Sequence, residues 1–129
     1  MKTELRKFPR IKSHARISYE FVKWSESGLD KIKKPNYAIT FDISVGGIGL
    51  SELHEVSPSM LKKLRKGTRK IRLAIFLYRN KPPLMTFARL IWNGTMDTEN
   101  IQRFGFIFID VSPHFYIEIM KYMNRHLKK

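Results

Sequence analysis

Apolar and polar residues alternate over several short stretches of this chain, which is typical of β-strands that bury one face. The first of these stretches runs from Ala15 to Phe21, and the second runs from Tyr37 to Ile43. Further strands are expected at residues 47–51, 71–77, 85–93 and 102–111. The pattern therefore predicts six strands of ordinary length.

Two helices are predicted from their end signals. Ser57 and Pro58 suit the start of a short helix, and Gly67 suits its end. Ser112 and Pro113 repeat the starting signal before a longer amphipathic helix. Its apolar face is expected to hold Tyr116, Ile119, Met120, Met123 and Leu127.

Six strands with turn signals between them predict a mainly β protein, an antiparallel barrel or sandwich with the C-terminal helix on an open side. The strand at 71–77 is apolar on both faces, so both faces are expected to be covered, and the terminal helix is one candidate for covering the face that points away from the core. Residues 1–13 are polar and basic, contain Pro9 and show no regular period, so they predict a flexible arm. Residues 14–129 are then expected to form a single domain.

The net charge is +14, from 25 Lys and Arg against 11 Asp and Glu, and this excess attracts anions in general. Cysteine is absent, which excludes disulfides and thiolate metal sites. The sequence shows neither an apolar signal region nor a run long enough to span a membrane. We therefore expect a cytoplasmic protein, and the charge alone does not decide whether it has an anionic partner.

Two clusters carry the candidate chemistry. Arg6 and Arg10 place two guanidinium groups four positions apart in the arm. Asp42 and Ser44 follow the second strand and stand just before the Gly46-Gly47 pair. Asp and Ser side chains bond nearby backbone in turns, and glycine lets a ligand or another backbone come close. An ordinary hairpin corner would explain the second cluster alone, but the pair of clusters is more specific.

The order Arg6-x-x-x-Arg10, then Asp42-x-Ser44-x-x-Gly47, resembles the paired signature of the PilZ family, bacterial receptor domains for cyclic di-GMP. The resemblance extends to the strand that ends at Asp110 and to the terminal helix. It implies a six-stranded antiparallel β-barrel with a C-terminal amphipathic α-helix. It also implies a ligand site at Arg6, Arg10, Asp42, Ser44, Gly46 and Gly47, with cyclic di-GMP as ligand and no other cofactor.

The residue types suit that ligand group by group. A guanidinium can donate paired hydrogen bonds to phosphate oxygens or to guanine O6 and N7, so Arg6 and Arg10 could serve either group. The carboxylate of Asp42 can only accept, which suits guanine N1–H and N2–H₂. Ser44 can donate to a phosphate or base acceptor, and Gly46 and Gly47 leave room for a flat base.

Neither catalysis nor a metal site is predicted. The histidines are scattered, and Ser44 lacks the frame of a nucleophile elbow. We expect a stand-alone receptor domain that orders its arm on binding and contacts a protein partner of unknown identity. Two alternatives stay open: a basic barrel for single-stranded nucleic acid, and an adaptor that has lost the ligand. Nucleic acid and an anionic membrane surface are allowed but less favoured partners.

Overall fold

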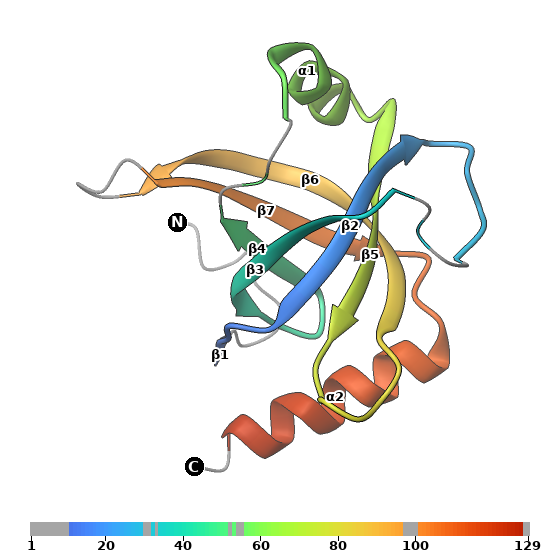
Figure 1. Ribbon diagram of the computed structural model, residues 1–129, viewed down its shortest axis with the longest axis vertical. Coiled ribbons are helices and arrows are strands. Elements are labelled where there is room, and N and C mark those ends of the chain that lie inside the picture. The colour runs from blue at the N-terminus through green and yellow to red at the C-terminus, as the bar shows by residue number, and fades with distance from the viewer. Residues whose placement is uncertain are drawn as a thin grey trace.

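The computed structural model describes residues 11–29, 32, 34–51, 53, 56–96 and 101–127 (Figure 1). Its strands are β1 (Ile11–Lys12), β2 (Arg16–Lys23), β3 (Asn36–Ile43), β4 (Gly47–Ser51), β5 (Arg69–Phe76), β6 (Leu84–Met96) and β7 (Ile101–Ile109). Its helices are α1 (Pro58–Lys66) and α2 (Pro113–Leu127). All six predicted strands and both predicted helices are present.

The sheet closes into a barrel. Its antiparallel pairs run in the order β3, β2, β5, β6, β7 and β4, and a further pairing of β4 with β3 closes the ring. Closure leaves no exposed edge around the ring, apart from the short β1, which pairs with β3. The strand pattern left a barrel or a sandwich open, and the closed ring confirms the six-stranded antiparallel barrel that the family resemblance implied.

The helices close the two ends of the barrel. In Figure 1, α2 lies across the lower end and α1 lies at the upper end, where its Leu64 is fully buried. The caps are those predicted: Ser57 accepts from the Met60 N–H, and Gly67 ends α1 with a φ of 79°.

The buried face of α2 contains Ile119 and Met123 as predicted, but Phe115 takes the place of Tyr116. Phe115, Ile119 and Met123 are buried, and the Phe115 ring meets Phe108 of β7 edge-on at 4.9 Å between centroids. Tyr116, expected on this face, is 45% exposed. The reason is that Phe115, Ile119 and Met123 repeat every four residues along one side of the helix, and the Tyr116 side chain points away from it.

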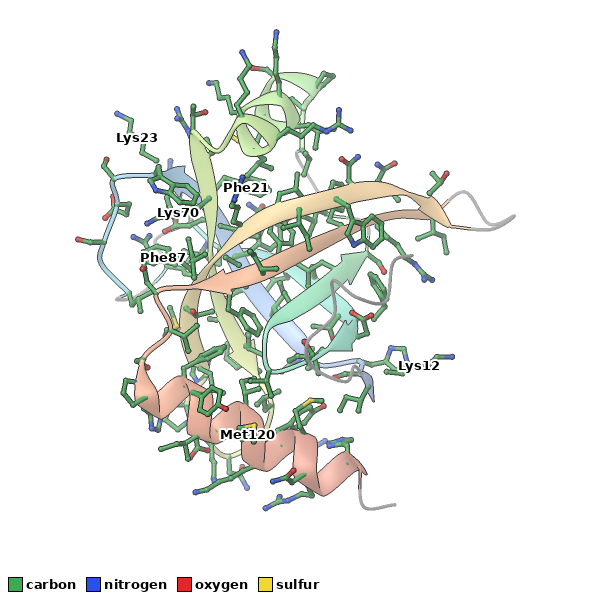
Figure 2. All side chains as sticks on the ribbon, turned by 180° about the vertical axis from the view of Figure 1, so that it is seen from behind. Lys12, Phe21, Lys23, Lys70, Phe87 and Met120 are labelled. Carbon is green, nitrogen blue, oxygen red and sulfur yellow. The ribbon has the colours of Figure 1, made fainter. Side chains whose placement is uncertain are left out.

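The outer face of β5 is covered by the loop after β2, and not by the terminal helix that the sequence offered as its cover. Arg72 bonds Glu20 of β2, reaches the Gly28 carbonyl from Nε at 2.8 Å, and pairs with Glu26 at 3.2 Å. Lys70 lies beside Phe87, its ammonium 3.9 Å from the ring centroid (Figure 2). Buried Arg and Lys stems thus take the place of a helix here.

Candidate functional site

A β-bulge in β3 places two consecutive side chains on the outside of the barrel. The register with β4 shifts between Thr40 and Asp42, while Thr40 itself is buried. A methyl group added at Gly49, on the outer face of β4, would overlap both the Phe41 ring and Asp42 Oδ1. Phe41 and Asp42 therefore both lie over Gly49, which leaves space for them because it has no side chain.

Glycines continue this outer face across two more strands. Asp42 pairs with Gly49, Gly49 with Gly105 of β7, and Gly105 with Trp92 of β6. The indole of Trp92 covers Gly105, because a methyl group there would overlap its pyrrole ring. Both glycines are therefore buried under neighbouring side chains, Gly49 under Phe41 and Asp42, and Gly105 under Trp92.

Ser44 shapes the turn between β3 and β4. Its buried Oγ accepts the N–H groups of Gly46 and Gly47 at 3.2 and 3.1 Å, which leaves the hydroxyl hydrogen to donate. Gly46 accepts from the Phe108 N–H at 2.9 Å. Gly47 faces the Phe106 carbonyl so closely that a Cβ would overlap it. The turn is thus held against β7, and the glycine that lies beneath Asp42 is Gly49.

Arg103 of β7 borders the same face. Its guanidinium carbon lies 4.6 Å from the Phe41 ring centroid, and its Nε is buried with no hydrogen-bond partner among the described residues. An N–H group in that position can donate a hydrogen bond to an acceptor atom of a ligand. Sequence reasoning missed Arg103, Phe41 and Gly49 as site residues.

A hollow of about 870 Å³ adjoins this face and falls within the ~300–1,000 Å³ common for ligand sites. One row of paired residues crosses it, from Arg16 through Ile39 and Ser51 to Arg103. Its lining is mixed aromatic, aliphatic and basic: His14, Arg16, Ile17, Tyr37, Ala38, Ile39, Thr40, Phe41, Ser51, Leu53, Phe76 and Arg103.

Arg6 and Arg10 lie outside the described residues, but the attachment point of their segment is described. In β1, Ile11 pairs with Ile43 and Lys12 pairs with Asp42. Ser13 is buried and shares a hydrogen bond of 2.9 Å with the hydroxyl of Tyr122 in α2. Three residues that the sequence assigned to the arm therefore lie against the barrel and α2.

Within the described residues, no group of His, Cys, Asp or Glu side chains could hold a metal ion. Nor does that part of the chain contain a helix with the length and apolarity needed to cross a membrane.

No family model matches the chain, and no curated protein matches it in sequence. Solved structures do match in shape. The Bacillus subtilis inhibitor of motility, MotI, superposes with a TM-score of 0.68 at 14% identity, over 96% of this chain and 52% of that one. The chain thus spans about half the length of MotI.

Two further matches carry a ligand in their structures. The PilZ domain of Escherichia coli YcgR, solved with cyclic di-GMP, gives a TM-score of 0.56 at 18% identity, over 89% of this chain and 86% of that one. Borreliella burgdorferi PlzA, solved in complex with cyclic di-GMP, gives a TM-score of 0.55 at 13% identity. The match covers 98% of this chain and 54% of that one. With its closed six-stranded barrel and C-terminal helix, this chain has the fold of a PilZ domain.

Proposed function

We propose that this protein is a receptor domain for cyclic di-GMP, and that the ligand lies on the outer face of β3, β4 and β7. The observation that carries the proposal is the pairing of β1 with β3, which places Ile11 and Lys12, just after the arginines in the sequence, beside Ile43 and Asp42. Arg10 directly precedes Ile11, and Arg6 lies within roughly 18 Å of Ile11 even with the chain fully extended. Both guanidinium groups can therefore reach a ligand held at Asp42.

The chemistry of this face suits the ligand. Asp42 offers carboxylate oxygens to the N1–H and N2–H₂ of a guanine. Phe41 and the Arg103 guanidinium offer flat groups on which a base can stack, and Arg103 Nε can donate to a base or a phosphate. The absence of side chains at Gly49 and Gly105 lets Phe41, Asp42 and Trp92 pack against the outside of the barrel, where they can face a ligand. Arg6 and Arg10 would neutralise the two phosphates.

Transmission of the signal would begin in the arm. Little apolar surface in residues 1–10 offsets the entropy of ordering that segment, so the ligand must supply the missing interactions. Ordering would pull on β1 and Ser13, and through the Ser13–Tyr122 hydrogen bond it would reach α2. In this proposal the output is a contact with a protein partner in the cytoplasm, and no catalytic step is involved.

Isothermal titration calorimetry with cyclic di-GMP tests the proposal, with GTP as the control nucleotide. We expect saturable binding of cyclic di-GMP and much weaker binding of GTP, which lacks the second guanine. Binding of the two nucleotides with equal affinity would mean that the protein responds to phosphate charge alone.

Variants then test the residues. Arg6→Ala and Arg10→Ala should each weaken binding by about 1.5–3 kcal/mol, since each removes charge-assisted hydrogen bonds. Arg79→Ala removes the same charge from an exposed turn and should leave the affinity nearly unchanged. Asp42→Asn keeps one acceptor oxygen and should cost less than Asp42→Ala. Equal losses for Arg6, Arg10 and Arg79 would contradict the assigned site.

A further inference from the structure

A second, smaller hollow lies between α1 and β6, and its Trp92 borders the face assigned to cyclic di-GMP because the indole lies over Gly105. It has a volume of about 360 Å³. Its lining comes from the two elements alone: Arg65, Arg89, Leu90, Ile91, Trp92 and Asn93. Two guanidinium groups and an indole thus meet in one depression.

A second β-bulge shapes this hollow. The register of β6 with β7 shifts between Leu90 and Trp92, and Leu90 is buried in the core. Ile91 is 48% exposed, and Trp92 lies outside the barrel with its indole over Gly105. The indole thus contacts backbone through its pyrrole ring, and because Trp92 is only partly buried and lines the hollow, it offers aromatic surface to a planar group.

Arg65 is held in place before any ligand arrives. Its Nε and Nη2 both donate to Asn93 Oδ1, at 3.1 and 2.8 Å. This contact fixes the guanidinium and leaves its remaining N–H groups for another acceptor. Arg89 lines the same hollow and has no ion pair or hydrogen bond among the described residues. Two cations in one hollow, of which Arg65 is held in position, favour an anion with more than one oxygen.

The positive charge around the hollow is larger than the charge needed to neutralise a single phosphate group. Neither α1 nor β6 contains an acidic residue. Exposed lysines of α1 extend the positive surface beyond Arg65, at Lys62, Lys63 and Lys66. In Figure 2 the blue nitrogen ends of side chains spread over α1 at the top of the molecule. This surface is complementary to a chain of phosphates.

We propose that the surface formed by α1 and the outer face of β6 binds single-stranded nucleic acid. One base stacks on Trp92, and the backbone phosphates next to that base accept hydrogen bonds from Arg65 and Arg89. The strand then continues along the lysines of α1. An aromatic platform beside a positive track is the usual arrangement of such sites. An acidic peptide would use the charges but has no planar base to place on the indole, so the combination favours a nucleic acid.

Fluorescence anisotropy with a short fluorescein-labelled oligothymidylate tests this proposal. Trp92→Ala and Arg89→Ala should each weaken binding by about tenfold. Arg89→Ala should also reduce the slope of log affinity against log salt by about 0.7, as for the loss of one phosphate contact on a single strand. Arg79→Ala is the matched control for charge and should preserve both the affinity and the slope.

Fold and charge are controlled separately. Trp92→Phe keeps a flat ring over Gly105 and should bind more tightly than Trp92→Ala, provided that circular dichroism shows both variants folded. The proposal is overturned if wild-type protein does not bind the oligonucleotide. It is also overturned if polyglutamate of the same charge competes equally well, or if Arg79→Ala weakens binding as much as Arg89→Ala. Asp42→Ala should not affect this binding, which separates the result from that for cyclic di-GMP.

Discussion

Gly49 determines which side chains can occupy the face where the ligand is proposed to bind. Its neighbours Ile48 and Leu50 point into the core, so Gly49 itself lies on the outside, beneath Phe41 and Asp42. The bulge in β3 brings both side chains there, and only the absence of a Cβ at Gly49 allows them to stay.

Gly49→Ala should therefore displace Phe41 or Asp42. We expect it to lower the free energy of unfolding by about 1–3 kcal/mol, as for other overpacked sites, and to weaken cyclic di-GMP binding. Gly94→Ala is a matched control, because a methyl group at Gly94 meets no atom within 4 Å. Urea denaturation and calorimetry measure the two effects. If Gly94→Ala and Gly49→Ala behave alike, the close packing over Gly49 is not what matters.

At the scale of elements, strands and helices were predictable because their signals are local. Alternation, the Ser57 and Ser112 caps and the Gly67 stop are each contained in a few neighbouring residues. The bulges and the pairing of strands depend on contacts across the chain and leave no such signal. The alternation around Phe104 and Phe106 places Arg103 and Gly105 on the outer face, but only the pairing of β7 with β4 brings them to the site.

The cover of β5 was missed for the same reason. Arg72 finds its partners Gly28 and Glu20 at sequence separations of 44 and 52 residues. Its burial could not be inferred from a pattern in which it reads as an ordinary polar position of a strand. The six candidate site residues were found from motif spacing, and their roles in binding stay predictions.

Removing the Arg72 side chain tests what holds the loop after β2 on the barrel. Arg72→Ala leaves Glu20 and Glu26 without their cation and the Gly28 carbonyl without its donor. We expect a loss of about 3–5 kcal/mol in the free energy of unfolding, as for a broken buried pair. Arg69→Ala, where the side chain bonds only the adjacent Thr68 carbonyl among the described residues, should cost under about 1 kcal/mol. Comparable losses in urea denaturation would contradict the role given to Arg72.

At the scale of the whole molecule, the segment entering the barrel is linked to both the candidate site and the terminal helix. Lys12 pairs with Asp42, and Ser13 bonds Tyr122, whose ring also packs against His126 at 4.2 Å between centroids. Figure 1 shows β1 beside β3 and near α2. In the proposed mechanism, a ligand that draws the arm onto the barrel would act on α2 through these contacts, without any change in the barrel itself.

Hydrogen exchange measured by mass spectrometry tests this coupling. We expect amide exchange in residues 4–13 to slow when cyclic di-GMP is added, because binding orders the arm. Exchange in β5 should change little, since that strand is already buried on both faces. Exchange in residues 4–13 that is equally slow with and without ligand would rule out the ordering step, even if the ligand binds.

The central claim is that cyclic di-GMP binds across β3, β4 and β7, and NMR titration of ¹⁵N-labelled protein tests it most directly. The account predicts that cyclic di-GMP shifts the amide signals of Asp42, Gly49 and Gly105 and the Nε–H signal of Arg103. Signals of Arg65 and Asn93, in the hollow by α1, should stay in place. Unshifted Asp42 and Gly49 signals at saturating ligand, or shifts confined to Arg65 and Asn93, would contradict it.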